Sequence, residues 1–93
     1  MIVYLKKFGN MLISRPAGRE AWLGARAYIL PESTEEKIIL DFEEVDVLTP
    51  SWADEFITNL IYRQGKANVE FKNTDNPSVR ETLELLFGST PLI

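Results

Sequence analysis

The side chains in this chain that could carry out catalysis are carboxylates, hydroxyls, lysines and arginines, because the sequence contains no histidine and no cysteine. The absence of both residue types excludes the usual zinc sites, a Ser-His-Asp triad and a thiolate nucleophile. The sequence also lacks a phosphate-binding loop motif. We therefore expect a protein that is not an enzyme and that has no catalytic residue, no metal site and no cofactor.

Two hydroxyls flank Pro50, at Thr49 and Ser51, where a helix is predicted to begin. A helix N-terminus stabilises an anion through its free N–H groups and its dipole, so Ser51 is a candidate phospho-acceptor. The alternative is that Ser51 or Thr49 only caps the helix, with Asp54 completing an approximate capping box.

Trp52 comes directly after these hydroxyls, and Asp54 and Glu55 follow it. An exposed tryptophan at this position would be an interface anchor, and the two acids would steer a basic partner. The alternative is that Trp52 packs under the neighbouring loop. The candidate partner-binding residues are Thr49, Ser51, Trp52, Asp54 and Glu55.

A second candidate site lies at Ser14, Arg15 and Arg19, where another helix is predicted to begin. Free backbone N–H groups and the two guanidinium groups would bind a small anion there. The structural alternative is a helix cap at Ser14, together with a glycine, Gly18, that allows close packing of the helix on the sheet.

Four acids, Asp41, Glu43, Glu44 and Asp46, follow an apolar run. Carboxylates at a strand end can hold magnesium. Charge runs more commonly face water, so we interpret this stretch as a solvated loop whose turn is fixed by Asp41.

Strands and helices alternate in the elements that must position these residues. The apolar patterns and turn residues predict strands at Ile2 to Leu5, Met11 to Ile13, Lys37 to Phe42 and Asn68 to Lys72. Helices are predicted to follow Ser14, Thr49 and Asn76, each with a proline near its start, and to end near Leu30, Gly65 and Gly88. The last residues, Thr90 to Ile93, are expected to be frayed or lightly docked.

The resulting order is β-β-α-β-α-β-α, which predicts an α/β fold with a mixed, mainly parallel sheet. Phe8-Gly9-Asn10 is a turn signal between two apolar segments, so we expect the first two strands to form an antiparallel hairpin. A length of 93 residues fits one domain, residues 1–93.

The charge balance and the apolar runs limit the location and the partners of the protein. With 10 basic and 14 acidic side chains the net charge is −4, which argues against a nucleic-acid partner. No apolar run approaches the ~20 residues needed to cross a bilayer. The opening residues do not resemble a signal peptide, so we expect a soluble cytoplasmic protein that does not bind membranes.

Two segments, Leu40-Asp41-Phe42 and Ser51-Trp52-Ala53-Asp54-Glu55-Phe56, carry a resemblance to a known family. The chain resembles the STAS-like domains of unknown function from bacteria and phages. These are distantly similar to the STAS domains of anti-sigma-factor antagonists. The resemblance implies a STAS-like fold and a role in signalling.

The resemblance also implies partner switching. STAS domains of the antagonist type bind a kinase-like ATPase, and phosphorylation of a hydroxyl at the start of the second helix breaks the complex. In an ungapped match Pro50 falls on the acceptor serine and Ser51 on the serine after it. A shift of one residue would put Ser51 or Thr49 at the acceptor position.

These observations predict a non-catalytic regulatory module that binds a protein through the start of its second helix. The resemblance suggests a histidine-kinase-type ATPase as the partner. The alternative function is a small-anion or nucleotide-sensing domain that uses the start of the first helix.

Overall fold

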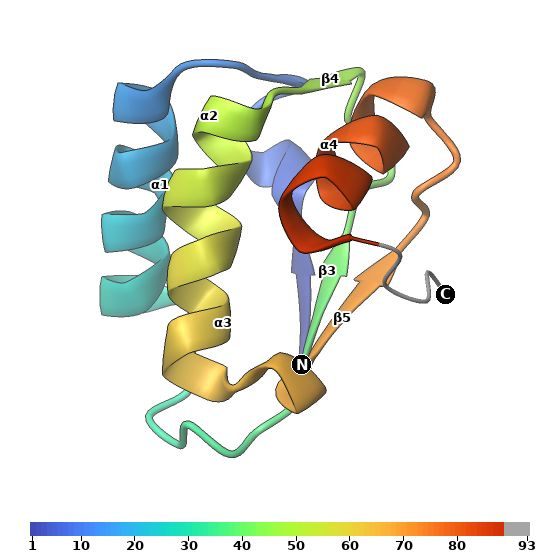
Figure 1. Ribbon diagram of the computed structural model, residues 1–93. Helices are drawn as coiled ribbons and strands as arrows, with labels where there is room; N and C mark the ends of the chain where they lie inside the picture. Colours follow the sequence, from blue (N-terminus) through green and yellow to red (C-terminus); the bar gives the residue numbers. More distant parts are fainter. Residues whose placement is uncertain (89–93) are drawn as a thin grey trace.

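The computed structural model describes residues 1–88 and contains a three-stranded sheet in the order β1-β3-β5. Its strands are β1 (Ile2–Tyr4), β3 (Ile38–Asp41) and β5 (Val69–Lys72), and both pairings are parallel. The central strand β3 is the one that its continuous apolar run predicts (Figure 1). The expectation for Thr90 to Ile93 lies outside the described residues.

The predicted N-terminal antiparallel hairpin is wrong. The second strand, β2 (Met11–Leu12), does not pair with β1 but forms a separate parallel pair with β4 (Val47–Leu48). A 3-10 turn, η1 (Leu5–Phe8), follows β1, and Gly9 adopts a φ of +119°. Because of this turn the chain does not fold back along β1. The β2–β4 pair is therefore separate from the three-stranded sheet.

Three helical regions complete the fold, and each begins at a predicted cap. Helix α1 (Arg15–Tyr28) is capped by Ser14, and α4 (Pro77–Phe87) is capped by Asn76. The second region is one continuous helix made of α2 (Pro50–Ala53), a π-helical segment (Asp54–Thr58) and α3 (Asn59–Gln64). A short 3-10 turn (Lys66–Asn68) then leads into β5.

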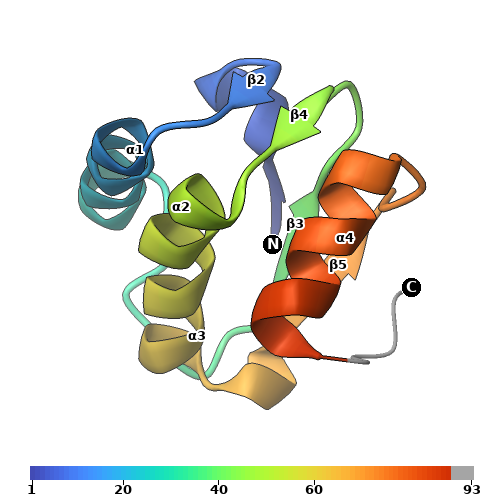
Figure 2. The same ribbon diagram turned by 45° about the horizontal axis from the view of Figure 1, so that its top comes forward.

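The helix α2–α3 lies between α1 and α4, as Figures 1 and 2 both show. The two flanking helices contact it from opposite sides, and their apolar residues join those of the strands in one core. The largest fully buried side chains of this core include Trp52, Phe56, Phe42, Leu40 and Leu60. On the face of the sheet away from this core, Ile2 and Tyr4 keep 40% and 41% of their surface exposed.

The first turns of α4 cover the edge of β4. The hydroxyl of Ser78 accepts a hydrogen bond from the Leu48 N–H at 3.0 Å, and the hydroxyl of Thr82 donates to the Leu48 carbonyl at 2.7 Å. These bonds satisfy the edge of a strand that has only β2 as a strand partner. None of the helices within residues 1–88 is both long enough and apolar enough to span a membrane.

Candidate functional site

Thr49 is the N-cap of α2, as one of the two sequence alternatives predicts. Its hydroxyl oxygen accepts a hydrogen bond from the Trp52 N–H at 3.3 Å. The same hydroxyl donates to the carbonyl of Ile13, which ties the start of α2 to the segment that leads into α1. The hydroxyl of Thr49 thus has a structural role as both donor and acceptor, and the predicted part of Thr49 in partner binding stays a prediction.

Ser51 takes no part in this cap. It is half-buried in the first turn of α2, and no hydrogen bond of its hydroxyl with residues 1–88 is found. Its predicted role as a phospho-acceptor stays a prediction.

Trp52 is buried, so its predicted role as an exposed interface anchor is wrong. Only 1% of its surface is exposed. The indole stacks on the ring of Phe56 with the centroids 5.1 Å apart, and the ring of Phe8 lies 6.1 Å away. Phe8 belongs to the turn after β1. Trp52 therefore packs under a neighbouring loop, which was the alternative prediction. The spacing of four residues between Trp52 and Phe56 is the signal that could have placed both on the buried face.

Asp54 and Glu55 bind the guanidinium of Arg15. The Arg15 Nη1 atom lies 3.0 Å from Asp54 Oδ2 and 3.2 Å from Glu55 Oε1. This contact joins the first turn of α1 to the π-helical segment. The hydrogen bonds from Arg15 and from Thr58 lower the pKa of Asp54 below its usual 3.8, and the same carboxylates raise the pKa of Arg15.

The predicted anion site at Ser14, Arg15 and Arg19 therefore faces competition. Arg15 already has two carboxylates as partners, and Ser14 accepts a hydrogen bond from the Ala17 N–H at 3.2 Å as the cap of α1. Arg19 lies exposed one turn further along the helix. A bound anion would share Arg15 with the Asp54 and Glu55 carboxylates, and the site stays a prediction.

Gly18 permits the close packing that the sequence predicts, although the neighbour is a helix and not the sheet. A Cβ atom at Gly18 would lie 2.7 Å from the carbonyl oxygen of Trp52 and 3.0 Å from its Cα. Side chains larger than hydrogen do not fit at this distance. The glycine thus brings α1 close enough to α2 for the Arg15 ion pairs to form.

The acids after β3 have separate partners. Asp41 is buried, and it accepts hydrogen bonds from the Glu43 N–H at 2.9 Å and the Asn73 side chain at 2.8 Å, which fixes the turn as predicted. Glu44 binds Lys6, whose pKa is raised by that hydrogen bond. Within residues 1–88 there is no group of three or more acids placed to hold a metal ion.

The π-helical segment is a feature that the sequence pattern did not reveal. Wider turns of this kind occur mostly as single insertions within α-helices and are frequent at functional sites. The side-chain amide of Asn59 donates to the Glu55 carbonyl at 2.6 Å, and the Thr58 hydroxyl donates to Asp54 Oδ1 at 3.0 Å. Local side chains therefore hold the widened turn in place.

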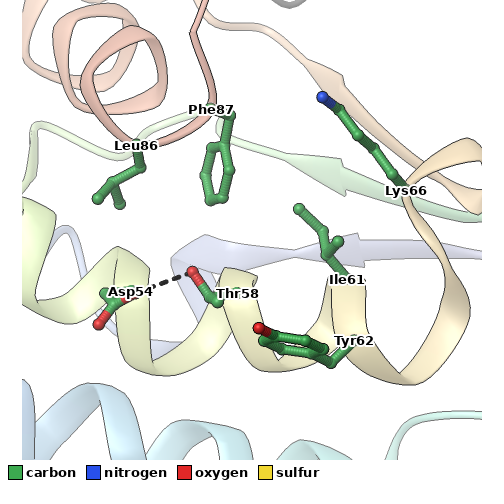
Figure 3. A pocket seen from close by; sticks show the side chains of 7 residues that line it. All are labelled: Asp54, Thr58, Ile61, Tyr62, Lys66, Leu86 and Phe87. Atoms are coloured by element: carbon green, nitrogen blue, oxygen red, sulfur yellow. Dashed lines mark hydrogen bonds between the residues drawn. The ribbon is translucent and has the colours of Figure 1, made fainter.

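An open groove lies between this helix and the end of α4 (Figure 3). Its volume is about 560 Å³. The polar and charged residues that line it are Asp54, Thr58 and Lys66, and the apolar and aromatic ones are Ile61, Tyr62, Leu86 and Phe87. Tyr62 is 85% exposed although it is a large aromatic residue. We call it the α3–α4 groove.

The chain was compared with models of known protein families. A model of the STAS-like domain of unknown function matches residues 26–79. The chain belongs to this family. Comparisons with curated proteins and with solved structures found no match.

The family match covers part of each candidate surface of this STAS-like domain. It includes β3, the acidic turn, the whole of α2–α3 and β5. It stops before Leu86 and Phe87, which form one wall of the α3–α4 groove, and it begins after Arg15. The match thus contains the helix that carries Ser51 and Asp54. It does not contain Arg15 of α1 or Leu86 and Phe87 of α4, which contact or face that helix.

Proposed function

We propose that this STAS-like domain is a non-catalytic regulatory module that binds a protein partner through the start of α2. Its contact surface comprises Pro50, Ser51 and the ion cluster formed by Arg15, Asp54 and Glu55. Trp52 supports this surface from inside the core. By family resemblance the partner is a kinase-like ATPase.

The observation that carries the proposal is the ion cluster. Arg15 and Asp54 keep 51% and 42% of their side-chain surface exposed, so their charges can reach a partner. They are held by contacts to two helices, and little side-chain freedom remains to be lost on binding. Fixed charges at an accessible surface favour selective protein recognition.

Ser51 gives this surface a means of regulation. A negative charge at Ser51 would lie on the same helical turn as Asp54, where carboxylates already compete for one guanidinium. The added charge would repel Asp54 and draw Arg15 away from it. Phosphorylation would thereby alter the contact surface without unfolding the helix.

The test begins with a partner identified by pull-down and continues with titration calorimetry. We expect Ser51→Asp to weaken binding about tenfold or more, equivalent to about 1.4 kcal/mol. Ser33→Asp is the matched control, because Ser33 is exposed and belongs to the loop between α1 and β3. Figure 1 shows this loop at the opposite end of the helices from the start of α2. Equal affinities of the two variants would move the interface away from α2.

The non-catalytic part of the proposal rests on the missing histidine and cysteine and on the structural use of Asp41. We expect a purified sample to hydrolyse no ATP. Turnover that persists through purification and is lost in Asp41→Asn would contradict this part of the proposal.

A further inference from the structure

The α3–α4 groove has a projecting aromatic side chain on its rim. Figure 3 shows the Tyr62 ring along the helix, beside Thr58 and below the apolar wall made by Leu86 and Phe87. Tyr62 is 85% exposed, and Leu85, next to Leu86 in α4, is 70% exposed. A tyrosine contributes large apolar area at low entropic cost and is enriched in interfaces. The same surface therefore presents both the α3–α4 groove and Tyr62, a side chain that could enter the equivalent groove of another copy.

The charges of the groove lie at its two ends. Asp54 is at one end and Lys66, in the turn that follows α3, is at the other, as Figure 3 shows. A second copy turned by 180° would place its Lys66 opposite Asp54 and its Asp54 opposite Lys66. The pattern is complementary to itself, as an interface with twofold symmetry requires.

The direction of the helices favours the same arrangement. The helix α2–α3 and α4 run in the same general direction (Figure 1), and the end of α4, at Leu86 and Phe87, lies over the Asp54 and Thr58 part of the groove (Figure 3). Two copies related by the 180° turn would place these helices antiparallel across the interface, with the helix dipoles opposed.

We propose that the α3–α4 groove is a self-association surface, in which Tyr62 of each copy enters the groove of the other and Asp54 pairs with Lys66 across the twofold axis. We expect a weak dimer, with a dissociation constant of roughly 10–100 µM. The inference goes beyond the proposed function and shares Asp54 with its contact surface, so Lys66→Glu and Tyr62→Ser, which lie outside that surface, distinguish the two.

The experiment measures molecular mass by analytical ultracentrifugation at protein concentrations from about 10 µM to about 1 mM, on either side of the expected constant. The native chain should pass from monomer to dimer. Asp54→Lys and Lys66→Glu should each weaken the dimer at least tenfold, because each places like charges opposite one another. An equimolar mixture of the two variants should recover native-like association, because opposite charges then face each other at both ends.

Two further variants separate the groove from other effects. Arg15→Gln removes the same ion pair that Asp54→Lys removes but keeps Asp54 and leaves it free to pair with Lys66, so it should dimerise at least as tightly as the native chain. Tyr62→Ser should weaken the dimer at least tenfold and leave the circular dichroism spectrum unchanged, because Tyr62 is exposed.

A native chain that stays monomeric at about 1 mM overturns the proposal. A dimer whose dissociation constant is unchanged by both Asp54→Lys and Lys66→Glu overturns it as well. A mixture of these two variants that fails to associate also overturns it. A monomeric native chain that instead binds an apolar dye in the groove would assign the groove to another ligand and would also overturn it.

Discussion

Gly18 and Gly24 lie in the same helix but in opposite surroundings. A methyl group at Gly18 would meet the backbone of Trp52 at 2.7 Å, whereas one at Gly24 would meet nothing within 4 Å. We expect Gly18→Ala to lower the free energy of unfolding by about 1–3 kcal/mol, because two backbones must separate. Gly24→Ala should raise it by about 0.5–1 kcal/mol, because alanine is the better helix former. A urea titration of each variant measures both values, and equal shifts would contradict the close approach of α1 to α2.

At the level of single residues, the sequence was informative wherever the interaction is local. The caps at Ser14, Thr49 and Asn76 were predicted because a cap involves residues at most three positions apart. The position of Trp52 was left between two alternatives because its burial depends on Phe8, which is more than 40 residues earlier in the chain. The partners of Arg15 were missed for the same reason.

At the level of elements, the ion pairs between Arg15 and the π-helical segment connect two helices through a group that titrates. The pKa of Asp54 is lowered in the folded chain, mainly by the hydrogen bond from Arg15 and then by that from Thr58. The unfolded chain therefore binds a proton more readily than the folded one near the usual pKa of 3.8. The stabilisation is present above that pH and is lost as the pH falls through the folded-state pKa.

This linkage predicts how an Arg15 variant depends on pH. At pH 7 Arg15→Gln should lower the free energy of unfolding only slightly, since exposed ion pairs contribute little. The difference from the native chain should shrink in acid well below pH 3.8, as the pH falls through the lowered folded-state pKa of Asp54. Arg19→Gln, with the same loss of charge on the same helix, is the control and should show no such change. Urea titrations at both pH values measure the effect, and a pH-independent difference would show that Asp54 is not the titrating partner.

The elements differ in how far the sequence could specify them. The stripe of Ala53, Phe56, Ile57 and Leu60 predicted one helix, and these four residues are buried. The π-helical segment within it was not predicted, because a single wider turn changes the spacing of apolar residues too little to be recognised over five residues. The α3–α4 groove was also missed, since its walls come from helices separated by β5.

At the level of the whole molecule, the alternation of strands and helices predicted an α/β fold with mainly parallel strands, and the family match supports it. The pairing of the first two strands could not be predicted in the same way. A turn signal at Phe8-Gly9-Asn10 favours a hairpin locally, but both strands have better partners in the segment from Ile38 to Leu48. The parallel pairings are preferred to the hairpin because of contacts that form only once α1 connects β2 to β3 and packs in the core.

These parallel pairings also constrain the order of events while the chain is being synthesised. Among residues 1–88, strand β1 pairs only with β3 and β2 only with β4, so neither meets its strand partner until about 35 further residues have left the ribosome. The three-stranded sheet cannot be completed before Val69–Lys72 has emerged. A nascent chain thus carries β1, β2 and α1 with their apolar faces uncovered through the first half of its synthesis, which makes that half the part most in need of a chaperone.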